Sequence, residues 1–134
     1  MCGIAGFCNW GADWQRNIER MNERMLHRGP DASGIWASED EEVVLGHRRL
    51  SIVDLTPSGA QPMVSHNERY VMAYNGEIYN YGRIRARLLE ERRVAAFRGT
   101  SDTEVLLEAV SAYGLEKTLA MAKGMFAIAV YDKK

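Results

Sequence analysis

The chain is short of cysteine and proline, with two of the first and three of the second among its 134 residues. Cys2 and Cys8 lie too close together to build a useful disulfide framework, and a reducing compartment would keep them as thiols. They also lack the Cys-x-x-Cys and histidine spacings of a zinc site. The sequence therefore predicts neither a disulfide scaffold nor a metal site. We expect Cys8 to be a small buried residue.

Long apolar runs and an excess of one charge are missing as well. No run of about 18 apolar residues occurs, so no membrane-spanning helix is expected. The N-terminus lacks the basic and apolar segments of a signal peptide. The formal net charge of -1 gives no overall attraction to nucleic acid or to an anionic membrane. We therefore expect a cytoplasmic protein whose partners include no nucleic acid and no membrane.

Length and composition fit one domain over residues 1–134, and the 46% hydrophobic content is enough to build a core. Helical spacing predicts helices over 14–27, over 81–88 and from the capping box at Ser101 to a stop at Gly114. Strands are predicted over 2–7, 35–37, 43–46, 49–53, 70–74 and 125–131, with a loop over 54–63. This mixture predicts an α+β fold in which antiparallel sheets are layered with helices.

Cys2 stands directly after the initiator methionine. If Met1 is removed, one residue carries both a thiol and a free α-amine, two groups that titrate near neutral pH. The amine can then accept the thiol proton, directly or through a water, as the N-terminal threonine enzymes activate a hydroxyl. Position alone favours an ordinary second residue, so the rest of the chain must decide.

Polar residues elsewhere supply what acyl transfer needs, although each has a simpler reading. Asn75-Gly76 is predicted to form a sharp turn after a strand, either a plain hairpin or two N–H donors that converge on an oxyanion. Arg49 lies in an apolar strand segment, where it can face solvent or bind a carboxylate through two hydrogen bonds. Asp102 at a helix start can interact with the helix dipole or accept hydrogen bonds from an ammonium. Arginine and aspartate together fit a free amino acid.

Longer blocks of the sequence resemble one family. They read MCGIAG (1–6), HRGPD (27–31), GHRRLSIVD (46–54), QP (61–62), YNGEIYN (74–80), GTSDTEV (99–105) and GMFA (124–127). In this order and spacing they resemble the glutaminase domain of glutamine-dependent asparagine synthetase, a class II glutamine amidotransferase of the N-terminal nucleophile hydrolase superfamily. The same branch includes enzymes that amidate sugars or other carboxylates, so the acceptor stays open.

The resemblance implies a four-layer αββα sandwich with two antiparallel sheets between helices, incomplete at its C-terminus because further strands of the family domain are missing from this sequence. It also implies a role for each matching residue. Cys2 would be the nucleophile, and Asn75 and Gly76 would form the oxyanion hole. The implied substrate-binding residues are Arg49 for the carboxylate of glutamine, Asp102 with Glu77 for its ammonium, and the backbone near Ile52 and Val53.

The implied activity is the glutaminase half-reaction, which hydrolyses L-glutamine to glutamate and ammonia through a cysteinyl thioester. The ammonia would pass to an asparagine synthetase domain of the same polypeptide. ATP and Mg are implied for that domain alone, because this chain has no glycine-rich phosphate loop and no cofactor is expected in it. The alternative is a catalytically silent truncated or regulatory domain. The oligomeric state, with a homodimer as one alternative, the end at Lys134 and the removal of Met1 all stay open.

Overall fold

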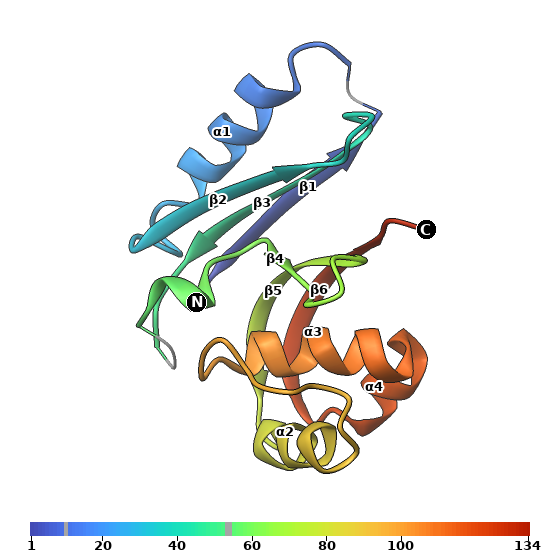
Figure 1. Ribbon diagram of the computed structural model, residues 1–134. Helices are drawn as coiled ribbons and strands as arrows, with labels where there is room; N and C mark the ends of the chain where they lie inside the picture. The colour runs from blue at the N-terminus through green and yellow to red at the C-terminus, as the bar shows by residue number, and fades with distance from the viewer. Residues whose placement is uncertain (10, 53–54) are drawn as a thin grey trace.

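The computed structural model describes residues 1–9, 11–52 and 55–134. It stacks two antiparallel three-stranded sheets between helices, as Figure 1 shows. The first sheet has the order β1-β3-β2 and consists of β1 (Gly3–Cys8), β2 (Ala32–Ala37) and β3 (Val43–Arg49). The second has the order β4-β5-β6 and consists of β4 (Met63–Val64), β5 (Tyr70–Ile78) and β6 (Gly124–Asp132).

Helices close both outer faces of this pair of sheets. Helix α1 (Trp14–Arg24) packs on β1 and β3, and a short 3-10 turn, η1 (Pro57–Gly59), lies in the connection between the sheets. On the opposite side lie α2 (Tyr81–Glu90), α3 (Asp102–Tyr113) and α4 (Leu115–Met121), with α3 against β5 (Figure 1). The layers are therefore helix, sheet, sheet, helices, which confirms the αββα order expected from the sequence.

Each sheet has its own apolar core on the side that faces its helices. Under α1, Ala5, Val44 and the fully buried Ile18 form the smaller core. A β-carbon on Gly46 would lie 2.7 Å from Ile18 Cδ1, so the missing side chain is what lets α1 lie this close to β3. The larger core joins β5 to α2 and α3 through residues such as Met72 and Leu106. Burying one such side chain contributes roughly 1.5–3 kcal/mol.

Several elements end elsewhere than the sequence predicts. Helix α1 stops at Arg24, not at residue 27, because the Met25 N–H already turns back to carbonyl groups of the last turn. The predicted strand over 49–53 is wrong for residues 50–52, since β3 ends at Arg49, and Val53 lies outside the described residues. The next two amides bond to side chains instead, Leu50 N to Cys2 Sγ and Ser51 N to the Asp31 carboxylate.

Asn75-Gly76 forms no turn, which corrects the hairpin prediction. Both residues lie inside β5, where Asn75 pairs with Ala127 and Gly76 with Phe126 of β6. Gly76 has a φ of +156°, and a β-carbon there would lie 2.3 Å from the Met125 carbonyl oxygen. The glycine is therefore required by close pairing with a strand that is distant in sequence, and local turn propensity cannot report such a partner.

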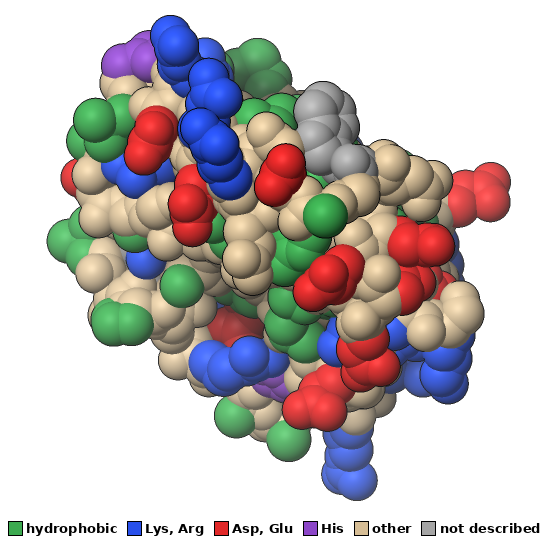
Figure 2. All heavy atoms as spheres, turned by 90° about the horizontal axis from the view of Figure 1, so that it is seen from above, with side chains coloured by type: hydrophobic (Ala, Val, Ile, Leu, Met, Phe, Trp, Pro, Cys, Tyr) green, Lys and Arg blue, Asp and Glu red, His purple; other side chains and the backbone are tan. Residues whose placement is uncertain are grey.

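Two further expectations concern the burial of Cys8 and the balance of charge on the surface. Cys8 is exposed rather than buried, because it is the last residue of the edge strand β1. The face above α1 carries side chains of both charges (Figure 2). Within the described ranges, no helix has the length and apolar character that crossing a bilayer requires.

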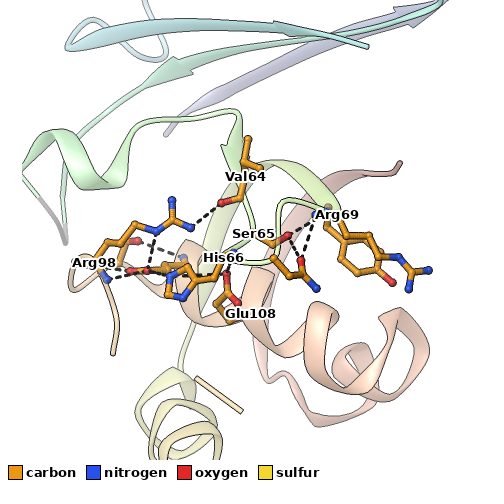
Figure 3. A network of polar contacts seen from close by, with 11 residues as sticks. Val64, Ser65, His66, Arg69, Arg98 and Glu108 are labelled. Carbon is orange, nitrogen blue, oxygen red and sulfur yellow. Dashed lines mark hydrogen bonds and ion pairs between the residues drawn. The ribbon is translucent and has the colours of Figure 1, made fainter. Parts of the chain in front are cut away.

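A buried acidic cluster anchors the first turns of α3. Glu104 is 1% exposed, and its carboxylate accepts hydrogen bonds from Arg98 N at 2.8 Å and Gly99 N at 2.9 Å. His66 Nε2 lies 2.8 Å from the same carboxylate, and His66 N donates to Glu108 (Figure 3). Burial raises the pKa of Glu108 above its ordinary value. The cluster therefore fixes two loops against the start of α3.

The start of α3 also has the cap that the sequence predicts. Ser101 is the N-cap residue, and its side chain accepts a hydrogen bond from Glu104 N. Gly114, with a φ of +85°, ends the helix as expected. These contacts set the position of Asp102 in the first turn.

One hydrogen bond joins the two sheets through a buried histidine. His47 of β3 is 1% exposed, and its Nε2 lies 2.9 Å from the Tyr74 carbonyl oxygen of β5. Burial lowers the pKa of His47 to about 4, although the bond to Tyr74 opposes the change. The ring is therefore neutral at neutral pH and donates its single N–H from Nε2.

Glu104→Gln is expected to lower the free energy of unfolding by about 2–4 kcal/mol, because the amide leaves one buried N–H without an acceptor. Urea unfolding measures the loss. The matched control is Glu91→Gln, which removes an exposed ion pair with Arg87 and should change stability by no more than about 0.5 kcal/mol. Equal small losses in the two variants would show that the cluster does not anchor α3.

Acid should destabilise the fold through His47. Its folded pKa of about 4 lies below the ordinary 6.5, so the unfolded chain binds more protons between these values. Above pH 6.5 the titration of His47 therefore costs no stability, and as pH drops to 4 it lowers the free energy of unfolding by about 3 kcal/mol. Unfolding free energies measured across this range in wild type and in His47→Gln, which cannot titrate, test the effect. Parallel pH slopes in the two proteins would refute it.

Candidate active site

A cavity of about 210 Å³ lies where β1 and α3 begin, β3 ends and β5 passes. It gathers every described residue that the sequence assigned to the site, namely Cys2, Arg49, Ile52, Asn75, Gly76, Glu77 and Asp102. Val53, the remaining predicted residue, lies outside the described residues. The fold thus brings together at one cavity predicted site residues that lie up to 100 positions apart in the chain, from Cys2 to Asp102.

Cys2 is held at the cavity by contacts from neighbouring segments. Its Sγ accepts a hydrogen bond from Leu50 N at 3.3 Å, and its carbonyl oxygen accepts one from Arg28 Nε at 3.1 Å. Met1 lines the same cavity and is 69% exposed. Removing this methionine would convert an amide nitrogen into a basic amine beside the thiol, and it would also open the cavity further.

Arg49 is buried, so the solvent-facing interpretation of this residue is wrong. It is 9% exposed at the end of β3, and its Nη1 donates to the Thr56 carbonyl oxygen at 2.8 Å. The turn η1 lies directly against the guanidinium, since a β-carbon on Gly59 would be only 2.2 Å from Arg49 Nη2. The sequence offered no local signal for Gly59, because its partner lies on another element.

Asp102 faces the cavity from the first turn of α3 and is 6% exposed. Its Oδ2 accepts hydrogen bonds from the Tyr74 hydroxyl at 2.6 Å and from Ile78 N at 3.0 Å. Burial, followed by this hydrogen bond, raises the pKa of Tyr74 far above its ordinary value. The phenol therefore keeps its proton and orients the carboxylate. The helix N-terminus adds a favourable dipole for a negative charge.

The candidate oxyanion donors lie on β5 opposite the thiol. Asn75 is half-buried and Gly76 is exposed, and both line the cavity that Cys2 lines. Glu77 follows on the same strand, and Ile52, which is 74% exposed, also lines the cavity. Pairing with β6 fixes the backbone of Asn75, Gly76 and Glu77 in a strand, and an anion site requires donors that are positioned in advance.

Sequence reasoning missed three cavity residues that support the others, namely Gln61, Tyr74 and Thr103. Gln61, 8% exposed, accepts a hydrogen bond from Tyr74 N at 2.6 Å and donates to Thr103 Oγ1 at 3.4 Å. Their signal was membership of the sequence blocks around them, because strand and helix patterns do not reveal hydrogen-bond partners. In the part of the chain that the structure describes, no group of three or more His, Cys, Asp or Glu side chains could hold a metal ion.

Two antiparallel sheets lie between helices, with the Cys2 thiol beside the cavity, which is the fold expected of the N-terminal nucleophile hydrolases. The fold agrees with a solved structure, glutamine phosphoribosylpyrophosphate amidotransferase from Bacillus subtilis in complex with ADP and GMP. The two match with a TM-score of 0.71 and 22% identity, over 98% of this chain and 34% of that one. This likeness shows the fold alone.

The particular family follows from the sequence comparison. The family model described as a glutamine amidotransferase domain matches residues 1–134. The chain therefore belongs to the glutamine amidotransferase domain family, as the sequence blocks indicated.

Curated relatives extend this result. Asparagine synthetase [glutamine-hydrolyzing] 1 of Bacillus subtilis is 41% identical over 138 residues, covering 99% of this chain and 21% of the relative. Asparagine synthetase B [glutamine-hydrolyzing] of Escherichia coli is 39% identical over 137 residues, covering 100% of this chain and 24% of the relative. Amidase chry2 of Gibberella zeae is 36% identical over 145 residues, covering 99% of this chain and 21% of the relative. The chain thus spans less than a quarter of the length of each of these proteins.

If Arg49 binds the carboxylate of glutamine, Gly59→Ala should raise the KM for glutamine at least about tenfold while leaving the fold intact, because the new methyl group displaces the guanidinium and weakens that charge-assisted contact. Steady-state kinetics of glutamate release measures the effect. Gly82→Ala is the matched control, since a β-carbon there meets nothing within 4 Å. An unchanged KM in the Gly59 variant would mean that Arg49 does not bind the substrate.

Proposed function

We propose that this chain hydrolyses L-glutamine to glutamate and ammonia, with Cys2 as the nucleophile. The observation that carries the proposal is the convergence of the thiol, a buried guanidinium, a buried carboxylate and the Asn75-Gly76 segment on one cavity. The guanidinium and the carboxylate match the two charged groups of a free amino acid, and the thiol beside rigid N–H groups suits acyl transfer. Membership of the glutamine amidotransferase domain family supports the same substrate.

The mechanism begins with binding. Arg49 binds the α-carboxylate of glutamine, Asp102 and Glu77 bind its α-ammonium, and the backbone around Ile52 and Val53 holds the chain of the substrate. The freed α-amine of Cys2 takes the thiol proton, and Sγ attacks the carboxamide carbon. The oxyanion of the tetrahedral intermediate then lies between the Asn75 side-chain N–H and the Gly76 backbone N–H, each worth roughly 3 kcal/mol.

The intermediate collapses when the α-ammonium of Cys2 returns its proton to the departing nitrogen. The C–N bond breaks, ammonia leaves and a γ-glutamyl thioester remains on Sγ. A water molecule, deprotonated by the same amine, attacks the thioester carbonyl and passes through a second oxyanion at the same donors. The C–S bond breaks, the thiol recovers its proton and glutamate is released.

The whole protein uses the ammonia in a second step that we also propose. By analogy with the longer asparagine synthetase relatives, a synthetase domain of the same polypeptide condenses ammonia with a carboxylate activated by ATP and Mg. Aspartate is the proposed acceptor, and a sugar or another carboxylate is the alternative. A homodimer remains a prediction. We propose the cytoplasm as the compartment, because a reducing environment keeps the Cys2 thiol free.

Cys2→Ala should abolish glutamine-dependent product formation by the protein, because the thioester cannot form. Ammonia-dependent product formation should continue, since that step bypasses the cavity. Cys2→Ser is the conservative control and should keep glutamine binding while losing most of its turnover, because a hydroxyl is a poorer nucleophile. The two activities are measured in parallel, with glutamine and with ammonium salts. Retained glutamine-dependent synthesis in Cys2→Ala would refute the proposed nucleophile.

A further inference from the structure

Tyr74, the residue before Asn75, is held at each of its three polar groups by a different segment. Its N–H donates to Gln61 Oε1 at 2.6 Å, and its carbonyl oxygen lies 2.9 Å from His47 Nε2. Its hydroxyl donates to Asp102 at 2.6 Å. Tyr74 and these three partners are all buried. The oxyanion segment therefore begins at a residue whose position is determined from three sides.

Two of these contacts satisfy backbone groups of Tyr74 that the short strand β4 does not reach. On one side, β5 pairs with β6 along its whole length, from Tyr70 to Ile78. On the other side, β4 pairs with β5 only at Val71 and Met72. Beyond that point, the side chains of Gln61 and His47 take up the N–H and C=O of Tyr74 that a longer strand would have bonded. A buried peptide group must find such a partner.

His47 differs from Gln61 because it belongs to the sheet that carries the nucleophile. It lies two positions before Arg49 on β3, and the following residue, Leu50, donates its N–H to Cys2 Sγ. Short, rigid connections thus run from the thiol through Leu50 and β3 to His47, and from there across the sheet interface to Tyr74.

We propose that His47 is a positioning residue for glutamine hydrolysis: its Nε2–H holds the Tyr74–Asn75 peptide, and with it the oxyanion donors, at a set distance from Cys2. The inference rests on the proposed function, because it assigns His47 to the reaction that Cys2 performs. The lowered pKa of His47 supports the proposal, since a ring that stays neutral near pH 7 keeps the same N–H donor throughout.

His47→Gln and His47→Asn form a matched pair for the test. The glutamine amide can place an N–H where Nε2 stood, whereas the asparagine amide is one bond too short to reach the Tyr74 carbonyl. Leu45→Ala serves as the structural control, because Leu45 is buried two positions earlier on the same face of β3 but makes no such bond. All variants carry Cys8→Ser, since the exposed Cys8 thiol would otherwise react with the probe.

Three quantities are measured well below the melting temperature: kcat for glutamine hydrolysis, KM, and the rate at which iodoacetamide alkylates Cys2. Alkylation forms no oxyanion, so it reports the thiol without the donors. His47→Asn should lose at least about tenfold in kcat, because misplacing a reacting group by a fraction of an ångström is costly. Its KM and alkylation rate should stay within about twofold, and His47→Gln should recover most of kcat.

The outcomes separate this inference from the proposed function. If the wild type fails to hydrolyse glutamine, the proposed function falls and the inference falls with it. If the wild type is active, the inference alone is overturned by an unchanged kcat in His47→Asn, by a loss in His47→Gln as large as in His47→Asn, or by a parallel fall in alkylation. Loss of kcat in Leu45→Ala equal to that in His47→Asn, or failure of both His47 variants to fold, would make His47 a residue of the fold only.

Discussion

The hydrogen bond between Leu50 N and Cys2 Sγ holds the thiol of the proposed nucleophile at the cavity. Terminal residues are poorly ordered unless other segments hold them. Here the pairing of Gly3 with Arg48 brings the start of β1 to the end of β3. The amide of Leu50, the first residue after β3, then contacts the thiol at 3.3 Å. Arg28 holds the Cys2 carbonyl from a third segment. The geometry of the cavity follows from this attachment.

The cavity combines two buried groups of opposite charge, Arg49 and Asp102, each with hydrogen bonds to other parts of the chain. Arg49 bonds to a backbone carbonyl, and Asp102 bonds to a phenol and a backbone amide. Buried charges are expensive unless hydrogen bonds compensate them. Tyr74 and Thr56 supply such bonds here, and the proposed ligand, a free amino acid, carries the two charges that match Arg49 and Asp102. Tyr74 bonds to the Asp102 carboxylate and directly precedes Asn75. One residue therefore helps to position both the proposed ammonium-binding group and the proposed oxyanion donors.

Local patterns in the sequence predicted what depends on neighbours along the chain. The periodicity of α2, the cap at Ser101 and the apolar strand β6 are of this kind, and the blocks of family-like sequence contain the predicted residues that line the cavity. The errors arose where a distant segment decides the structure. Asn75-Gly76 pairs with β6 instead of turning, the strand after Arg49 ends because side chains take its amides, and Cys8 is exposed at a sheet edge. His47, Gln61 and Gly59 matter through partners that no local pattern reveals.

An intact-mass measurement after reaction with an electrophilic glutamine analogue tests the central claim, that Cys2 is a nucleophile activated by its own amine. The expected product is the chain without Met1, carrying one adduct that maps to Cys2, with labelling slowed by added glutamine. A catalytically active preparation in which Met1 is still attached would contradict the claim. So would an unlabelled Cys2, which would favour a catalytically silent domain, or an adduct found only on Cys8.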